Sequence, residues 1–500
     1  MVDGRIPEVA PDDAFSGRSE LRYDSAANGF TGMLRADGGN ERFALHFDGL
    51  YRDNGNYEIA GGELPNSFIE TRTGALGASL LGDWGFVGFA ASRYLNTYGN
   101  PGEPGDPATG EPGVFLDVAQ NRHELKGGLA QSFGIFSGAR FAIASSDYEH
   151  TEFEGEEVGT VFVNDSTDGR VELTHAEIGN WKGAIGIQFG HRDFEAMGAE
   201  AFVPRTATRS LGIFLVEQRK WDRFQLDLGA RIDDVESDPV NAETRRFNPI
   251  SLSAGAVWRV DNDWHFSFNL DRAERAPAEE ELFANGPHIA TASFEIGDPR
   301  LMEEAANQAE LGMHFHSDKA DAKISVYYNR FDDYIFLIDT GEMAEDLPVR
   351  QWTQIDARFR GLEGEVLWHL ADNAYGAFDL RLFGDTVRAT LSEGGGNVPR
   401  IVPSRVGADL RWRSAGWRAS LGAVRHADQE DTALGETPTD GYTLVDAHVA
   451  YHIDTPNFAW EVFADATNLT DRKARVHTSF LKDRIVLPGR GLSLGVRAYF

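Results

Sequence analysis

The chain has 500 residues, no cysteine and a formal net charge of −32, from 47 basic and 79 acidic side chains. This charge argues against a nucleic-acid partner, which would be repelled, and makes cations the more natural partners. The absence of cysteine excludes disulfide bonds and thiolate metal sites, so a metal ion would need histidine and carboxylate ligands. The richest apolar stretch, residues 74–92, is interrupted by Asp83, so a helical membrane protein is not expected.

Along the chain the dominant pattern is an alternation of apolar and polar residues with a period of two, which is typical of β-strands with two different faces. In residues 264–271, large apolar residues occupy the even positions and polar residues the odd ones. The pattern recurs in residues 224–232 and 406–413 and in the last ten residues. About 22 such runs begin near residues 17, 29, 41, 73, 85, 121, 139, 168, 182, 207, 222, 250, 263, 305, 320, 356, 375, 404, 416, 441, 457 and 491.

The connections between these runs alternate between short and long. The short connections include residues 82–83, 261–263, 317–319 and 414–416. The long connections include residues 95–120, 150–167, 272–304 and 332–355. A soluble β-sandwich would also alternate along its strands, but it has no reason to segregate its connections in this way, whereas an outer-membrane barrel has short periplasmic turns and long extracellular loops. The sequence therefore predicts an all-β, transmembrane antiparallel β-barrel of about 22 strands.

A barrel of this size has an apolar face toward lipid and a polar face toward its lumen. An even number of strands places both chain ends on the same side of the membrane. The lumen is too wide to be filled by inward side chains, and barrels of this class normally hold a plug.

Two groups of segments carry a resemblance to a known family. Near the C-terminus these are Asn468–Asp471, His477–Asp483, Leu487–Gly491 and the final Phe500. Earlier in the chain they are Arg275–His288 and Phe294–Pro299. Together they resemble TonB-dependent outer-membrane receptors, in a form closest to the subgroup associated with zinc uptake. The terminal Phe500 resembles the signal that the barrel-assembly machinery reads.

The resemblance implies a division of the chain into a remnant of the plug's C-terminal end or linker, residues 1–16, and a receptor β-barrel, residues 17–500. Val2–Pro7 looks like the tail of a plug, and we expect the rest of the plug, with the segment that contacts TonB, to be absent from this chain. The expected partners are the lipid bilayer of the outer membrane, the barrel-assembly machinery and a metal ion or metal chelate. The TonB complex is expected as a partner of the full-length family.

The function implied by the resemblance is uptake of a scarce nutrient across the outer membrane, with zinc or another metal ion as the expected substrate and no resident cofactor. A siderophore or haem receptor is the nearest alternative, and it would use aromatic and arginine contacts to a bulky ligand. A plugless barrel acting as a passive pore or surface-binding protein is a further alternative. No residues form a recognisable nucleophile or acid/base pair, so an enzyme is not expected.

Candidate metal ligands follow from the resemblance, which implies histidine and carboxylate side chains in the long loops, and these suit zinc. Odd-numbered runs rise from the periplasm, so the histidines at or near the extracellular end are His123, His150, His191, His288, His426 and His477. The candidates are His150 with Glu149, Glu152 and Glu154, then His288 in the family-like motif, and then His426 with Asp428. The first group is also consistent with a solvated acidic loop. His314 and His316 share a strand face near a periplasmic turn and are expected to line the lumen.

Overall fold

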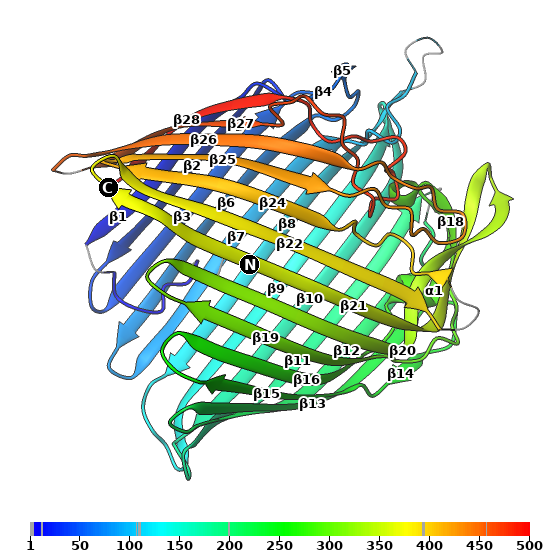
Figure 1. The fold of residues 1–500 in the computed structure, drawn as a ribbon. Coiled ribbons are helices and arrows are strands. Elements are labelled where there is room, and N and C mark those ends of the chain that lie inside the picture. Colours follow the sequence, from blue (N-terminus) through cyan, green and yellow to red (C-terminus); the bar gives the residue numbers. More distant parts are fainter. Residues whose placement is uncertain are drawn as a thin grey trace.

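The computed structural model describes residues 5–11, 14–106, 108, 112–198, 201–392, 396–456 and 458–500. These residues form a closed β-barrel whose strands lie strongly tilted around a wide lumen (Figure 1). Neighbouring wall strands pair antiparallel and follow the chain order. Of the segment that resembles a plug tail, Val2, Asp3 and Gly4 lie outside the described residues.

Twenty-two strands make up the wall of the barrel, as the alternation predicted. The first eleven are β1 (Phe15–Asp24), β2 (Gly29–Gly39), β3 (Phe43–Asn54), β6 (Ile69–Gly82), β7 (Gly85–Gly99), β8 (Val114–Leu129), β9 (Phe136–Glu154), β10 (Glu157–His175), β11 (Trp181–Gly198), β12 (Thr206–Lys220) and β13 (Phe224–Pro239). The others are β15 (Ile250–Arg259), β16 (Trp264–Arg275), β19 (Glu304–His316), β20 (Ala320–Ala344), β21 (Leu347–Asn373), β22 (Gly376–Leu391), β24 (Arg405–Ser414), β25 (Trp417–His426), β26 (Tyr442–Asp454), β27 (Ala459–Thr467) and β28 (Gly491–Tyr499).

Small elements occur in the connections that follow the wall strands β3, β13, β16 and β22. They are β4 (Glu58–Ile59), β5 (Gly62–Glu63), β14 (Arg245–Phe247), α1 (Glu279–Phe283), β17 (Asn285–His288), the 3₁₀ turn η1 (Ile289–Thr291), β18 (Ser293–Ile296) and β23 (Gly396–Asn397). Among the described residues, no helix is long and apolar enough to cross a bilayer.

The barrel closes where its first and last strands meet. β1 pairs antiparallel with β28, from Arg18 opposite Tyr499 to Asp24 opposite Ser493. Closure leaves no sheet edge in the membrane, where an unpaired backbone group would have no water to bond.

The two faces of the wall differ as the period of two requires. Large apolar residues such as Leu211, Ile213 and Leu421 keep about half of their surface exposed, at 51%, 48% and 54%. They face outward, toward lipid. On the inner face, Arg381 of β22 forms ion pairs with Glu365 of β21 and with Asp409 of β24, the latter at 3.1 Å. The polar lumen face is thus a network of charged side chains that spans neighbouring strands.

Two of the predicted long loops are instead β-hairpins that extend beyond the membrane. A strand needs about 9–11 residues to cross a bilayer, but β9 and β10 have 19 residues each, and β20 and β21 have 25 and 27. The segments 150–167 and 332–355 therefore belong mainly to strands. Outside the membrane neither strand face contacts lipid, so the alternation that marks a strand fades while the backbone pairing continues. We use the term extracellular cap for the ends of β9, β10, β20 and β21 that extend beyond the membrane, together with the long connections at the same end of the barrel.

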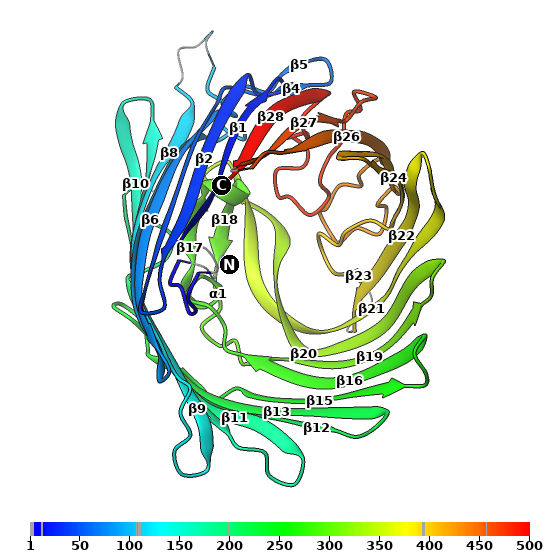
Figure 2. The same ribbon diagram turned by 90° about the vertical axis from the view of Figure 1, so that its left-hand side faces the viewer.

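The described part of the N-terminal segment, from Arg5 onward, lies inside the ring of strands, against the inner wall (Figure 2). Ile6 is buried against Phe86 and Ala90 of β7, and Arg5 forms an ion pair of 3.4 Å with Asp48 of β3. The close approach requires a glycine in β6, because a Cβ atom at Gly77 would lie 1.6 Å from the carbonyl oxygen of Arg5.

At the other end of the chain, the Phe500 ring packs on Phe15 with centroids 5.5 Å apart, and its carbonyl accepts a hydrogen bond from the Gly17 amide. The terminal aromatic residue is therefore part of the closing seam of the barrel.

Candidate functional site

His150 occupies a partly buried position near the extracellular end of the 19-residue strand β9, beyond the residues that cross the bilayer. Its ring stacks on Phe162 of β10 with centroids 4.3 Å apart, and its Nδ1 lies 3.2 Å from the Tyr148 hydroxyl. Burial, together with the nearby His288 imidazole, lowers the pKa of His150 to about 4. The imidazole is therefore neutral at physiological pH, which is the state that binds metal ions.

His288 lies at the end of β17, in the connection between β16 and β19. Its ring stacks on Phe202 at 4.3 Å, and its Nδ1 lies 2.9 Å from Glu295 Oε1. Glu295 is only 2% exposed. Burial raises the pKa of this carboxyl, but hydrogen bonds from His288, Thr291 and Trp352 outweigh burial and give a net lowered pKa. A buried, ionised carboxylate therefore holds the His288 ring in place.

A single hydrophobic cluster connects the two histidines. Phe162, which contacts His150, and Phe202, which contacts His288, pack together with Val203 and Ala284. We call His150, His288, Phe162, Phe202 and Glu295 the imidazole patch. The sequence predicted the two histidines as separate loop candidates, and the structure brings them to one place in the extracellular cap.

The acidic residues proposed with His150 do not all join it. Residues 147–154 form a strand, so Glu149 and His150 point to opposite faces, whereas Glu152 and Glu154 share the face of His150. Glu152 is 8% exposed. Within the described residues, no group of three or more histidine, aspartate or glutamate side chains is arranged to hold a metal ion. The patch thus offers two imidazoles and leaves further ligands to come from elsewhere.

His426 and Asp428 make contacts within their own hairpin. His426 stacks on Tyr442 at 4.6 Å, and Asp428 accepts a hydrogen bond of 2.8 Å from the Gly441 amide. Arg425 lies 3.7 Å from the Asp428 carboxylate. These contacts close the connection between β25 and β26, and the structure does not bring either residue into the imidazole patch.

The histidines near the periplasmic turns join the polar lining of the wall. His314 stacks on His265 of the neighbouring strand with centroids 4.4 Å apart. His316 pairs with Asp321, and His369 Nδ1 lies 2.7 Å from Asp379. These side chains belong to the network of the inner face, as was expected for His314 and His316.

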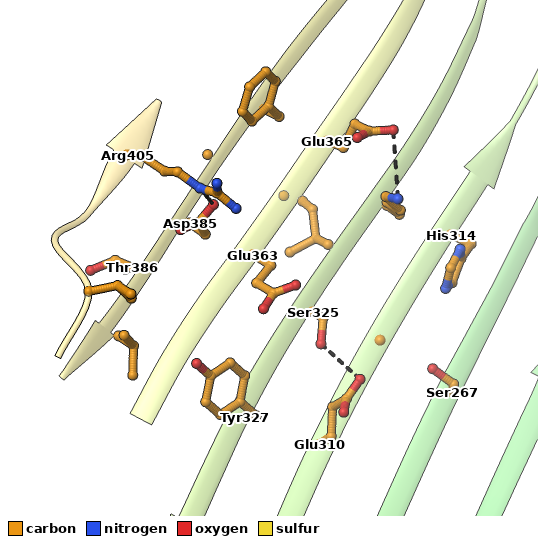
Figure 3. Close-up of a pocket in the computed structure, with 18 of the residues that line it drawn as sticks. Ser267, Glu310, His314, Ser325, Tyr327, Glu363, Glu365, Asp385, Thr386 and Arg405 are labelled. Carbon is orange, nitrogen blue, oxygen red and sulfur yellow. Dashed lines mark hydrogen bonds and ion pairs between the residues drawn. The ribbon is translucent and has the colours of Figure 1, made fainter. Parts of the chain in front are cut away.

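A hollow of about 530 Å³ in the inner wall was not predicted (Figure 3). Strands β16 to β24 line it with side chains of both charges, and Figure 3 shows Asp385 beside Arg405, with Glu363 and Glu365 on the neighbouring strand. Glu310 accepts a hydrogen bond of 2.9 Å from Ser325, and Arg405 pairs with Asp385 at 2.6 Å. Aligning the polar positions of adjacent strands in the sequence could have found this surface, because it consists of the inward residues of consecutive runs.

A second unpredicted feature lies in the cap, where Arg350 at the start of β21 and Arg400 in the connection before β24 both approach the ring of Phe480. The guanidinium carbons lie 4.9 Å and 4.0 Å from the ring centroid. These residues are far apart in the sequence and follow no periodic pattern, so no sequence signal marks them as neighbours.

A closed barrel of 22 strands, with short turns at one end and a folded cap at the other, defines an outer-membrane β-barrel with a receptor-like extracellular surface. Residues 10–469 match the family model described as "TonB dependent receptor-like, beta-barrel". The chain belongs to this family, which is a family of outer-membrane transporters. The resemblance at family level is confirmed, whereas the zinc subgroup and the plug remnant at residues 1–16 remain predictions.

Solved structures with the same fold include receptors with different cargo. The copper transporter OprC has a TM-score of 0.86 and 16% identity, over 99% of this chain and 84% of that one. The FrpB iron transporter from Neisseria meningitidis (F5-1 variant) has a TM-score of 0.80 and 14% identity, over 98% and 83%. A double mutant of the Serratia marcescens hemophore receptor HasR, in complex with its hemophore HasA and heme, has a TM-score of 0.76 and 14% identity, over 99% and 82%. At these identities the likeness establishes the fold.

Proposed function

We propose that this protein is a TonB-dependent receptor that takes up a transition metal, with zinc as the favoured ion, and that His150 and His288 are the first protein ligands of the cargo. Family membership supports transport across the outer membrane. The imidazole patch supports the nature of the cargo, because histidine is the commonest ligand for zinc and copper in sites without cysteine.

The observation that carries this proposal is the state in which the two imidazoles are held. His288 directs its Nδ1 to the buried Glu295 carboxylate, which is the arrangement that orients metal-binding histidines and leaves Nε2 to face the ion. His150 directs its Nδ1 to the Tyr148 hydroxyl and is neutral at physiological pH. Both rings are thus fixed by stacking, with Nε2 as the atom left for a metal.

Two imidazoles are a weak site by themselves, since zinc is usually four-coordinate. Weak coordination suits a receptor that must release its cargo inward, and water or cargo-borne ligands would complete the shell. The net negative charge of the chain, −32, would concentrate cations near the opening.

The experiment that tests this proposal is calorimetric titration of the refolded 500-residue chain with zinc chloride, in wild type and in a variant carrying His150→Ala and His288→Ala. A matched control is His316→Ala, which removes an imidazole whose side chain is 72% exposed near the periplasmic end. The proposal expects zinc binding that the double substitution weakens at least tenfold and that His316→Ala leaves unchanged. Equal binding by wild type and the double variant would refute it.

A further inference from the structure

The outer face of β20 changes from apolar to charged at the extracellular edge of the membrane. Its outward residues Ile324, Val326 and Tyr328 are exposed because they face lipid, and the tyrosine lies at the level where aromatic side chains border the apolar band. The period of two places Arg330 next on this face, and its side chain is exposed as well. Arg330 therefore lies at the level of the lipid head groups.

The two following strands show the same change. On β21 the exposed Arg358 and Arg360 precede the outward Leu362, and on β22 Arg388 lies on the outer face. Strand pairing aligns these side chains, because Arg358 lies opposite Arg330 and Arg360 lies opposite Arg388. We call Arg330, Arg358, Arg360 and Arg388 the arginine patch.

Acidic side chains meet the arginine patch at two of its corners. Arg330 lies 3.0 Å from Asp332 and 3.5 Å from Asp356. Arg388 forms an ion pair with Asp431. The protein itself thus supplies counter-charges for the two outer arginines.

The two arginines at the centre of the patch are placed differently. Arg358 and Arg360 are exposed, and among the described residues neither has a carboxylate oxygen at ion-pair distance. Asp356 shares their strand and face, but it pairs with Arg330 and accepts a hydrogen bond of 3.2 Å from the Asp333 amide. Like charges directly opposite one another in a sheet repel, so this arrangement favours an anion bound between the strands.

Other carboxylates of these strands face the lumen. Glu363 of β21 and Asp385 of β22 line the hollow of the inner wall (Figure 3). Because successive side chains of a strand point to opposite faces, the wall separates these carboxylates from the arginines. The centre of the patch is thus open to an anion from outside the protein.

The outer face of β9 and β10 carries the opposite charge at the corresponding level. The exposed Ile143 of β9 and Val171 of β10 face lipid. The alternation places Asp147 and Glu149 of β9 and Asp165 of β10 on the same outer face, with Asp165 opposite Asp147. The net charge of the chain is −32, so the arginine patch is a local feature and not the consequence of a basic chain.

We propose that the arginine patch binds phosphate groups of lipids in the outer leaflet of the membrane. Lipid surrounds this face, and anionic head groups attract arginine and lysine side chains at the membrane surface. A guanidinium group binds phosphate through two parallel hydrogen bonds. Directly opposite Cβ atoms of paired strands lie about 4.5–5.5 Å apart, so two neighbouring arginines reach the same phosphate. The patch lies outside the barrel, and the inference does not depend on the metal cargo.

The test is native mass spectrometry of the refolded full chain in non-ionic detergent. The probes are diphosphoryl lipid A and the same glycolipid without its phosphate groups, with inorganic phosphate as a competitor. One variant carries Arg358→Gln and Arg360→Gln, and a second carries Arg358→Lys and Arg360→Lys, which keeps both charges without the planar fork. The matched control is Arg209→Gln, because Arg209 is an exposed, outward arginine of β12 that has a carboxylate partner, Glu236, at 3.4 Å. Heat-modifiable gel mobility shows that each variant has folded.

The proposal expects wild type to bind diphosphoryl lipid A about tenfold or more tightly than the dephosphorylated glycolipid. The double glutamine variant should lose about tenfold or more of this affinity, the lysine variant should lose less, and Arg209→Gln should stay within about twofold of wild type. Unchanged binding in the glutamine variant would overturn the proposal, as would equal binding of the dephosphorylated glycolipid. Displacement of the lipid by an equimolar amount of inorganic phosphate would indicate a site for free phosphate and would overturn the assignment to lipid.

Discussion

The membrane-crossing wall and the extracellular cap are built from the same strands but are held together differently. In the wall, each strand has one face in lipid and one in water. Outward apolar residues such as Ile213 therefore alternate along each strand with inward polar residues such as Arg381. In the cap, β20 and β21 continue without lipid on either side, and stability comes from local clusters and buried ion pairs such as Lys482–Glu436. The wall is therefore determined by a simple pattern, and the cap by particular contacts.

The largest effect should come from removing the Glu436 carboxylate, which His477 and Lys482 both contact in the cap. Glu436→Ala leaves the buried Lys482 and His477 without their carboxylate, which costs about 3–5 kcal/mol of local stability. Hydrogen exchange in residues 468–490 should accelerate strongly, while the exposed Glu430→Ala should have no such effect. The pKa of Glu436 is lowered to about 2, mainly because hydrogen bonds outweigh burial, so its contribution should persist above pH 4.5 and disappear as the pH falls toward 2. Unchanged exchange in the variant would contradict this account of the cap.

The wall should respond to charge in a way that depends on its face. Ile213→Arg places a cation in lipid near the middle of β12 and should destabilise the barrel by about 2–4 kcal/mol. Ser253→Arg adds the same side chain to the lumen face of β15, where water solvates it, and should change little. Urea unfolding in lipid vesicles measures the free energy of unfolding of both variants. An equal loss of stability in the two would show that the assignment of faces is wrong.

The sequence predicts the wall well and the cap poorly, because the alternation that lipid imposes is present only in the wall. The predicted starts at residues 29, 85, 250, 320 and 491 are the first residues of β2, β7, β15, β20 and β28, because lipid enforces alternation there. The segments 150–167 and 332–355 were expected as loops because that constraint ends at the membrane surface.

The candidate site was predictable only in part. His150 and His288 stand out because histidines are rare and the second lies in a family-like motif. Their meeting depends on the packing of Phe162 and Phe202, and the Arg350–Phe480–Arg400 arrangement depends on three separate connections. Contacts between distant segments of a cap leave no periodic signal.

A smaller effect should appear in the pH dependence of the cap. The pKa of His150 is lowered to about 4 by burial and by His288, below the value of about 6.5 in an unfolded chain. The unfolded chain thus binds more protons between these values, so metal-free wild type should lose about 1–2 kcal/mol as the pH falls from 6.5 to 4, allowing for solvent screening. His150→Gln should lack this component in urea titrations at a series of pH values. Parallel curves for the two proteins would count against a buried, neutral imidazole.

The smallest effect is expected from an exposed ion pair in the extended hairpin. Arg330 lies 3.0 Å from Asp332 and 3.5 Å from Asp356, but its side chain is 55% exposed. Arg330→Gln should cost less than about 1 kcal/mol, as measured by urea unfolding alongside the Glu436 variant. A loss comparable to that of Glu436→Ala would mean that surface charge, and not buried contact, stabilises the cap.

The central claim, that the cap presents two imidazoles to a metal cargo, is tested most directly by X-ray absorption spectroscopy of the zinc-loaded chain. The account predicts two imidazole nitrogens at about 2.0–2.1 Å, with oxygen donors completing the shell. Their scattering should be lost in the variant carrying His150→Ala and His288→Ala. A shell of oxygen atoms alone in wild type, or an imidazole signal that survives both substitutions, would contradict it.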